Sequence, residues 1–239
     1  GGEIGGVKGK SAGGTGDILR LLDAGWSKVD NYPQAISAVR EKGGAVVAGV
    51  YDRVPVLYPT LYGPELVIAF ETWLSEVVSR SDAVVAISRS SAKCYAEYAM
   101  MRYKWCSSQK IGWWRLGANL LAETSGEPTA AAIEIAAQGP FFLCVGTIEA
   151  RKGYPVALEA FERLWAENID VNLVIVGRPG WNAQAFEQRL RQHEEKGRRL
   201  FWLDDASDAD LRHLYCETRA AVFTAFAEGF GLPLVEAAQ

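Results

Sequence analysis

Short runs of consecutive apolar residues alternate along this chain with longer segments in which apolar residues recur at helical spacing. Unbroken apolar runs separated by helices predict parallel strands that are buried on both faces, which is an α/β architecture. We expect strands at residues 44–51, 83–87, 110–116, 141–145, 171–176, 200–203 and 220–224. We expect helices at 32–41, 66–79, 88–101, 155–167, 183–197, 207–218 and from Leu232 onward.

The alternation occurs in two series that are separated by a looser stretch. Residues 117–139 contain Ser125-Gly126-Glu127-Pro128 and a run of alanines, so we interpret them as a linker with room for a short helix. We therefore expect two Rossmann-like, doubly wound parallel-sheet domains, residues 1–116 and 140–239, with a cleft between them. Both domains look incomplete, because the first lacks an obvious opening strand and the second stops at Gln239 inside a helix. We expect a fragment that is truncated at both ends.

The composition narrows the classes of partner. The chain is 49% hydrophobic and 23% charged, as is usual for a soluble globular protein. Its net charge of −4 provides no global basic field, so we expect no nucleic-acid partner. No apolar run approaches the ~20 residues that a membrane span needs. The four cysteines, at positions 94, 106, 144 and 216, form no Cys-x-x-Cys pair, so we expect free thiols and a cytoplasmic location.

The segment with the most chemical content follows the last apolar run. Gly229 and Gly231 indicate a tight loop whose backbone can approach a ligand, and Pro233 suits the first turn of a helix. A helix that begins at the carboxyl end of a parallel strand favours a bound diphosphate. Glu228 and Glu236 would repel phosphate, so we expect them to accept hydrogen bonds from sugar hydroxyls. Glu236 taken alone would equally suit a helix N-terminus, where it complements the helix dipole.

Glu228 and Glu236 enclose seven residues, in Glu228-Gly229-Phe230-Gly231-Leu232-Pro233-Leu234-Val235-Glu236. This segment resembles the E-x7-E motif of glycosyltransferases of the GT-B fold, specifically family 4 as found in bacterial polysaccharide assembly. The resemblance implies that Glu228 contacts the transferred sugar and that Glu236 binds the ribose of the nucleotide. It also implies that the backbone of Phe230, Gly231 and Leu232 faces the sugar and the diphosphate. Many members carry Pro-Ser where this chain has Thr224-Ala225, a mild departure.

A second resembling segment follows the strand expected at 141–145. It holds an Arg-Lys pair ahead of a helix, where cations can neutralise a leaving diphosphate. The family has a lysine at the position of Lys152, but often an arginine where this chain has Thr147. Taken alone, the Arg-Lys pair is more typical of a solvated loop. Across this half of the chain, the resemblance implies donor contacts at Gly146, Thr147, Arg151, Lys152, Gly177 and Arg178.

In the first half of the chain, the resemblance implies acceptor contacts at Asp52 and Ser88, which follow two of the expected strands. Members often carry His-Asp where this chain has Tyr51-Asp52, and its histidines, His193 and His213, both lie in the second half. Asp52 would equally suit a turn, and Ser88 would equally suit the N-cap of a helix.

Two further patterns suggest other ligands. Asp208-Ala209-Asp210 matches the D-x-D of metal-dependent glycosyltransferases of another fold, but Ser207 and Asp210 stand in the relation of a capping box before an apolar helix. We therefore expect a helix cap there, and neither a metal nor another cofactor. Gly9-Lys10-Ser11 lacks the earlier glycine and the preceding strand that a phosphate-binding P-loop needs, so we reject that interpretation.

A basic and aromatic stretch suggests a membrane partner. An anionic inner membrane face, where a lipid-linked acceptor would be found, would attract such a stretch. The alternative is a helix end and a strand whose tryptophans pack under lysine stems, and the lack of a clear amphipathic period favours it. The residues concerned are Arg102, Tyr103, Lys104, Trp105, Lys110, Trp113, Trp114 and Arg115.

The resemblance spans roughly residues 16–239 and implies a transferase that retains the anomeric configuration. We expect it to move a mannose-like hexosyl group from a nucleotide diphosphate sugar, with GDP-mannose favoured, to a glycan or lipid-linked acceptor. Lys152 and the helix at Pro233 would stabilise the departing diphosphate during a front-face attack that uses no protein nucleophile. A non-catalytic nucleotide-sugar-binding protein and a nucleotide-sugar epimerase of the same architecture remain alternatives. The fragment alone is expected to be inactive.

Overall fold

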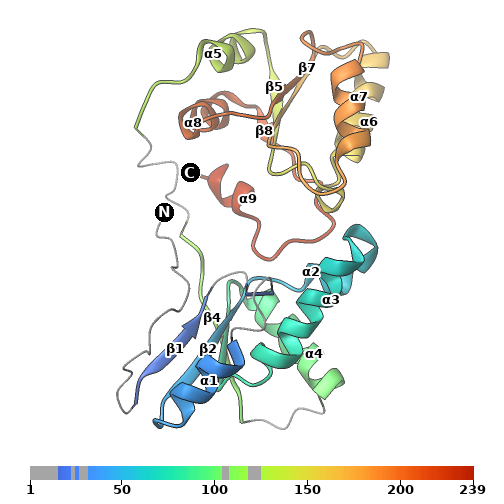
Figure 1. Cartoon of the computed structure of the whole chain (residues 1–239). Coiled ribbons are helices and arrows are strands. Elements are labelled where there is room, and N and C mark those ends of the chain that lie inside the picture. The colour runs from blue at the N-terminus through green and yellow to red at the C-terminus, as the bar shows by residue number, and fades with distance from the viewer. Residues whose placement is uncertain (1–15, 23–24, 27–31, 104–107, 118–124) are drawn as a thin grey trace. The chain divides into compact units, whose positions relative to one another are not determined.

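The computed structural model describes residues 16–22, 25–26, 32–103, 108–117 and 125–239. Their strands form two parallel sheets of four strands each, and each sheet belongs to its own compact unit (Figure 1). The prediction of an α/β chain with two parallel sheets is therefore confirmed. None of the helices in the described ranges is long and apolar enough to cross a membrane.

The sheet of the first unit follows chain order. Its strands are β1 (Ile18–Leu21), β2 (Ala45–Val50), β3 (Ala83–Ala86) and β4 (Lys110–Trp113). The helical elements are α1 (Tyr32–Arg40), α2 (Val54–Leu57), η2 (Pro59–Leu61), α3 (Pro64–Trp73), its π-helical continuation η3 (Leu74–Val78) and α4 (Arg89–Tyr103). The core joins strand residues such as Val46 and Val84 to Trp73 and Tyr95 from the helices, all of them nearly inaccessible to solvent.

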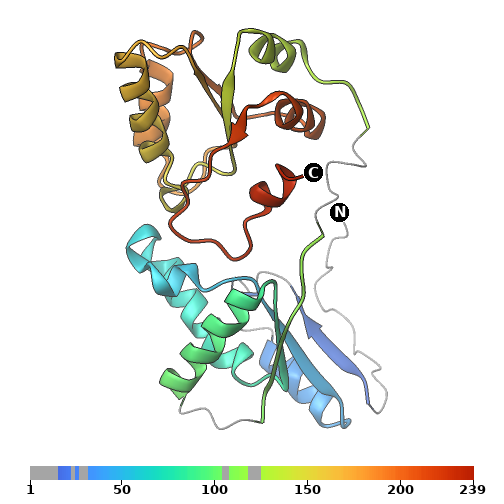
Figure 2. The same ribbon diagram turned by 180° about the vertical axis from the view of Figure 1, so that it is seen from behind.

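The sheet of the second unit has the order β7-β6-β5-β8. Its strands are β5 (Phe141–Val145), β6 (Asn172–Val176), β7 (Leu200–Leu203) and β8 (Ala220–Ala221). The helical elements are α5 (Ala130–Ala137), η4 (Ala150–Lys152), α6 (Tyr154–Ala166), α7 (Gln184–Gln192), α8 (Asp208–Glu217) and α9 (Leu232–Glu236). Helices α6 and α7 cover one face of the sheet and α5 and α8 cover the other, as both views show (Figures 1 and 2).

This strand order creates a switch point next to β5. From β5 the chain moves outward through β6 to β7, and it then crosses back to place β8 on the other side of β5. Loops that leave two such strands diverge to opposite faces of the sheet, which leaves a crevice at their carboxyl ends. Open parallel sheets commonly bind ligands at such a switch point, which in the second unit lies where the chain leaves β5 and β8.

Most of the predicted strands and helices form in the predicted order, and the differences have local causes. Residues 18–21 lie outside the strands expected above, and they pair with β2 as β1. The strand expected at 110–116 ends at Trp113. The helix expected at 183–197 ends at Gln192, because His193 takes an extended conformation and its ring Nδ1 accepts the Glu195 N–H at 3.1 Å. The linker expected at 117–139 contains α5, and its residues 118–124 lie outside the described ranges.

The strand expected at 220–224 also ends early, at Ala221. The Val222 N–H still reaches the carbonyl of Leu143 at 2.8 Å, so the chain leaves the sheet just after this residue. Beyond it, the Thr224 hydroxyl and the Phe226 N–H bond instead with backbone carbonyls of the turn that follows β5. An apolar run looks the same whichever of these two sets of partners its backbone bonds with. The strand was therefore predicted to continue beyond Ala221.

The Asp208-Ala209-Asp210 segment forms the predicted capping box. The Ser207 hydroxyl accepts the Asp210 N–H, and the Asp210 carboxylate accepts the Ser207 N–H and hydroxyl in return. The same carboxylate also accepts the N–H and hydroxyl of Thr129, which is the N-cap of α5. Burial opposes its ionisation, but these donors outweigh burial and lower the pKa of Asp210 from 3.8 to about 2. One buried carboxylate thus fixes the first turns of two helices.

The remaining sequence features lie partly outside the described ranges. Of the four cysteines, Cys94, Cys144 and Cys216 are free thiols, and Cys106 lies outside the described ranges, as does the Gly9-Lys10-Ser11 segment. In the basic and aromatic stretch, residues 104–107 are likewise not described, while the Trp113 side chain is 44% exposed with the Arg115 guanidinium 6.0 Å from its ring.

Candidate functional site

The turn that follows β5 carries the two predicted cations. After Val145, the chain makes the short 3-10 turn η4, which places Arg151 and Lys152 side by side, and it then enters α6 through Gly153. Gly153 has φ = 66°, and a Cβ at this position would overlap the backbone of Thr224. Only glycine satisfies both conditions without strain, so this residue lets the turn pack directly against the segment that follows β8.

Two hydrogen bonds join these segments. The Thr224 hydroxyl donates to the carbonyl of Lys152 at 2.9 Å, and the Phe226 N–H donates to the carbonyl of Arg151 at 2.8 Å. The loop after β8 is therefore anchored along the turn after β5 for several residues. This anchoring brings Glu228 to the two cations, although the sequence separates them by more than seventy residues.

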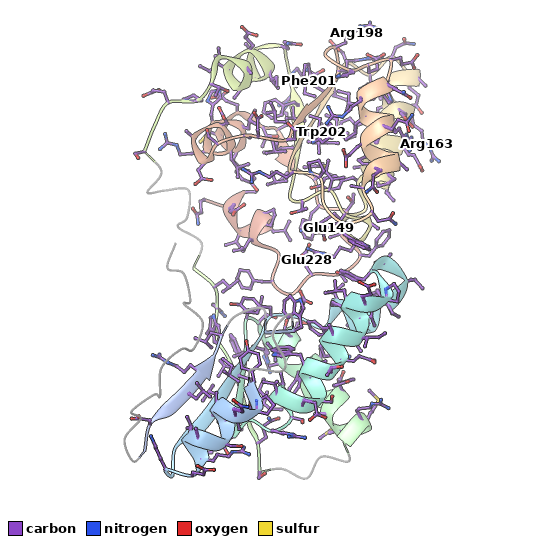
Figure 3. The ribbon with its side chains drawn as sticks, viewed as in Figure 1. Glu149, Arg163, Arg198, Phe201, Trp202 and Glu228 are labelled. Carbon is purple, nitrogen blue, oxygen red and sulfur yellow. The ribbon has the colours of Figure 1, made fainter. Side chains whose placement is uncertain are left out.

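Four charged side chains gather at this junction. The Glu228 Oε1 atom accepts a hydrogen bond from Arg151 Nη1 at 2.7 Å and forms an ion pair with Lys152 Nζ. Arg151 Nε donates in turn to Glu149 Oε2 at 2.8 Å, and the Glu149 and Glu228 side chains lie in the same part of the second unit (Figure 3). Lys152 is 10% exposed and Arg151 19% exposed, so the interpretation of this pair as a solvated loop is wrong.

The electrostatics of this charge cluster, Glu149, Arg151, Lys152 and Glu228, are balanced. Two carboxylates face two cations, so the cluster has no formal net charge. Burial alone would lower the pKa of Arg151, but the carboxylates of Glu228 and Glu149 outweigh burial and raise it above its ordinary value. Arg151 therefore stays charged at any physiological pH, and a ligand anion would compete with Glu228 for the two cations.

A small pocket opens between the ends of β5 and β8. Its volume of about 10 Å³ is room for about one water molecule. The Lys152 Nζ atom lies 6.0 Å from the ring centre of Phe223, and both residues line this pocket. The Tyr154 hydroxyl donates to the carbonyl of Gly146, and burial raises the pKa of this tyrosine. The pocket is lined by Val145, Lys152, Tyr154, Val222, Phe223, Thr224 and Ala225.

The predicted residues near β6 lie beside the same strand ends. The Ile148 N–H donates to the carbonyl of Arg178 at 2.9 Å, which ties the segment after β5 to the segment after β6. The carbonyl of Gly177 accepts the indole N–H of Trp202 at 3.0 Å. The side chains of Thr147 and Arg178 are exposed. These residues thus surround the carboxyl edge of the sheet, outside the charge cluster.

The final segment brings the second glutamate to α8. Gly231, with φ = 88°, is the N-cap of α9, and Phe230 before it is half-buried. The carboxylate of Glu236 accepts a hydrogen bond from the Tyr215 hydroxyl at 3.0 Å. Burial and the negative charge of Glu236 raise the pKa of Tyr215. Tyr215 therefore stays protonated and can hold this carboxylate in one orientation.

The acceptor-side candidates, Asp52 and Ser88, both lie in the first unit, just after β2 and β3. Asp52 Oδ1 accepts the Val54 N–H at 3.0 Å, as a turn residue does. Ser88 Oγ accepts the Ser91 N–H at 3.0 Å and so caps α4. The Ser91 hydroxyl donates to the carbonyl of Tyr51 at 2.9 Å, which joins the two strand ends. Asp52 thus acts as a turn residue and Ser88 as a helix N-cap, which are the alternatives that the sequence left open.

Sequence reasoning missed the partners of the predicted residues. Glu149 balances Arg151 and Tyr215 orients Glu236, yet neither was proposed for the site. Glu149 carried a signal, because its charge stands two residues before Arg151 in the same short loop. Tyr215 carried none, since an aromatic residue on a helix is usually part of the core.

Known proteins resemble this chain in sequence. The family model of glycosyl transferases group 1 matches residues 127–239. A serotype-specific mannosyltransferase WbdA of Escherichia coli is 37% identical over 230 residues, which are 93% of this chain and 28% of that protein. An O-antigen chain mannosyltransferase B of Escherichia coli is 37% identical over 108 residues, which are 44% of this chain and 27% of that protein. The chain thus spans 28% or less of the length of these curated relatives.

Solved structures share the architecture. An α,α-trehalose 6-phosphate synthase of Burkholderia multivorans has a TM-score of 0.65 at 14% identity, covering 93% of this chain and 53% of the other. The Anabaena protein Alr3699/HepE, in complex with UDP and glucose, has a TM-score of 0.60 at 17% identity, covering 92% and 56%. At these identities the likeness concerns the fold, and the structural neighbours are GT-B glycosyltransferases, as the sequence predicted. Residues 127–239 are therefore a glycosyl transferases group 1 domain, and the chain has the fold of these GT-B neighbours.

Proposed function

We propose that this chain carries the donor site of a retaining hexosyltransferase that uses a nucleotide diphosphate sugar. The observation that supports it most strongly is the meeting of Lys152 and Glu228 at the carboxyl ends of β5 and β8. A cation and a carboxylate from opposite sides of a switch point provide one group for phosphate and one for sugar hydroxyls.

The roles follow from the chemistry of each group. Lys152 and the backbone N–H groups at Gly231 and Leu232 would hold the diphosphate. Glu228 would accept hydrogen bonds from hydroxyls of the transferred sugar, and Glu236 from the ribose. The other donor contacts would come from Gly146, Thr147, Phe230, Gly177 and Arg178, which lie beside the same strand ends. Asp52 and Ser88 would contact the acceptor.

The proposed reaction needs no protein nucleophile. The acceptor hydroxyl attacks the anomeric carbon on the face from which the diphosphate departs, while the bond between that carbon and the phosphate oxygen breaks. The hydroxyl proton passes to the departing phosphate oxygen. Negative charge grows on the diphosphate in the transition state, so a preorganised cation lowers the barrier there more than in the ground state.

The relatives suggest the substrates. Both are named mannosyltransferases, and one name refers to an O-antigen chain, so we favour GDP-mannose as donor and a glycan or lipid-linked glycan as acceptor. Because the chain spans only part of these relatives, transfer is best measured on the intact protein that carries it.

The test is transfer of labelled mannose from GDP-mannose to a mannose-containing oligosaccharide, with the anomeric configuration of the product read by NMR. We expect Lys152→Ala and Glu228→Gln to lose most of the transfer while the protein stays folded. Lys196→Ala is the matched control, because Lys196 is exposed and lies in the turn before β7, away from the carboxyl ends of β5 and β8. Near-native turnover in both site variants would refute the assignment.

The alternatives give different readouts in the same experiment. An epimerase would release a nucleotide sugar with an inverted sugar centre and would need no acceptor. A non-catalytic binding protein would bind GDP-mannose and leave it unchanged. Inversion of the anomeric centre during transfer would contradict the proposed front-face reaction.

A further inference from the structure

We propose that Arg151 is a positioning residue that holds Glu228 in place, braced by Glu149, rather than a ligand of the diphosphate. This inference rests on the proposed function, because it concerns the residue expected to contact the transferred sugar. It assigns different tasks to two neighbouring cations that the sequence placed together on the diphosphate.

The contacts of Arg151 point to this role. Its Nε atom donates to Glu149 at 2.8 Å, and its Nη1 atom donates to Glu228 at 2.7 Å and reaches the carbonyl of Ala227 at 3.4 Å. Its own carbonyl accepts the Phe226 N–H. The guanidinium and the backbone of one residue therefore bind the loop after β8 at three successive positions, just ahead of its glycines.

Lys152 differs from Arg151 in its freedom to turn. A guanidinium is a rigid planar fork, so Arg151 cannot move toward a new anion without losing Glu149, Glu228 and Ala227 together. An ammonium is a point charge on a flexible stem, and that of Lys152 forms an ion pair with Glu228. When a diphosphate enters, Lys152 is thus the cation that can leave Glu228 at the smaller cost.

This difference has a consequence for Glu228. When Lys152 turns to the diphosphate, Glu228 loses one of its two ion pairs. The ion pair with Arg151 then keeps the Glu228 carboxylate in place. Arg151 is itself held by Glu149, so its fork keeps one orientation and presents Nη1 to Glu228 throughout the cycle. The other carboxylate oxygen of Glu228, Oε2, can then accept a hydrogen bond from a sugar hydroxyl. Loss of Arg151 should harm the placement of the sugar while sparing the capture of the nucleotide.

The experiment compares two quantities in the intact protein: the dissociation constant of GDP, by calorimetry, and kcat with GDP-mannose. We expect Arg151→Ala to lower kcat by about 100-fold, since a misplacement of about 1 Å costs that much, with GDP affinity within about threefold of wild type. Lys152→Ala should instead weaken GDP binding by about tenfold or more, as loss of a charge-assisted contact does.

Two milder variants separate positioning from folding. Glu149→Gln keeps the shape of the brace but not its charge, and should lower kcat by about tenfold without changing GDP affinity. Arg151→Lys keeps the charge but cannot bond Glu149 and Glu228 at once, so it should recover part of the activity that Arg151→Ala loses. Arg189→Ala is the control for loss of an ion-paired arginine, because Arg189 pairs with Glu162 on α6, outside the cluster, and its kcat should match wild type.

The outcomes are distinct. If Arg151→Ala weakens GDP binding as much as Lys152→Ala does and full kcat returns at saturating donor, Arg151 is a diphosphate ligand and the inference is wrong. If Arg151→Ala fails to fold, kcat and GDP affinity are compared in Glu149→Gln and Arg151→Lys instead. Weakened GDP binding with full kcat in these variants would equally refute the inference. If wild-type protein neither binds GDP nor transfers mannose, the proposed function itself fails, and the inference fails with it.

Discussion

Replacing Asp210 with asparagine tests how the second unit is held together. The Asp210 carboxylate is 3% exposed and accepts four hydrogen bonds, from Thr129 N at 2.6 Å, Thr129 Oγ1 at 2.8 Å, Ser207 Oγ at 2.7 Å and Ser207 N at 2.9 Å. An amide group keeps one of the two acceptor oxygens and turns the other into a donor. The backbone N–H of either Thr129 or Ser207 then faces the new amide NH₂ group and loses its acceptor.

The expected cost follows from these contacts. A buried donor without a partner costs about 1–3 kcal/mol, and the weakened hydrogen bonds to a formerly ionised group add to this. We therefore expect Asp210→Asn to lower the free energy of unfolding of the second unit by about 2–4 kcal/mol. Urea unfolding gives the magnitude. Hydrogen exchange should show the loss of protection at the first turns of α5 and α8.

Asp208→Asn is the matched control, because Asp208 is exposed in the same first turn. It should cost only the dipole interaction, about 0.3–1 kcal/mol. Equal costs for the two variants would refute the capping account. So would equal loss of a metal-dependent activity in both, since a metal-binding D-x-D needs both carboxylates.

The same carboxylate predicts a pH dependence. Its folded-state pKa of about 2 lies below the ordinary 3.8, so ionised Asp210 stabilises the fold fully above the higher value and less as the pH falls toward the lower one. The difference between these two pKa values corresponds to about 2 kcal/mol. The stability gap between wild type and Asp210→Asn should therefore narrow by this amount between pH 4 and pH 2. A constant gap would contradict the assignment.

Two other variants test the geometry of the site. Gly153→Ala should lower the free energy of unfolding by clearly more than Gly197→Ala. Both glycines have positive φ, at which an alanine costs about 1–2 kcal/mol. Only at position 153 would the new Cβ also overlap a backbone segment, that of Thr224. Urea midpoints compare the two, and equal values would contradict the close packing. Tyr215→Phe removes the donor to Glu236, so GDP affinity measured by calorimetry should fall by about fivefold; unchanged affinity would show that Glu236 does not bind the ribose in this orientation.

The fold was largely predictable because buried parallel strands carry their own signal. Unbroken apolar runs such as residues 141–145 and 171–176 became β5 and β6. The ends of elements were less predictable where side chains outside the element decide them. Gln192 is the last residue of α7 because the ring of His193 captures a backbone N–H, and β8 stops at Ala221 because the turn after β5 offers other partners.

The sequence predicted that Glu228 and Lys152 share one site, but it did not predict the contacts between their side chains. Glu228 and Lys152 were expected at one donor site from their motifs, and the structure brings them into an ion pair. The pairing of the two cations with two carboxylates was not predicted. Ion pairs between segments so far apart in the chain produce no pattern in the sequence. Glu149 and Tyr215 act on the motif residues from outside the motifs, and only the folded chain brings them there.

The central claim is that the ends of β5 and β8 bind the diphosphate of the donor. A crystal structure of the intact protein with GDP tests it most directly. We expect phosphate oxygens within hydrogen-bond distance of Lys152 Nζ and of the loop N–H groups at Gly231 and Leu232, with Glu228 still paired to Arg151. GDP bound elsewhere, or GDP bound with Lys152 still paired to Glu228, would contradict the account.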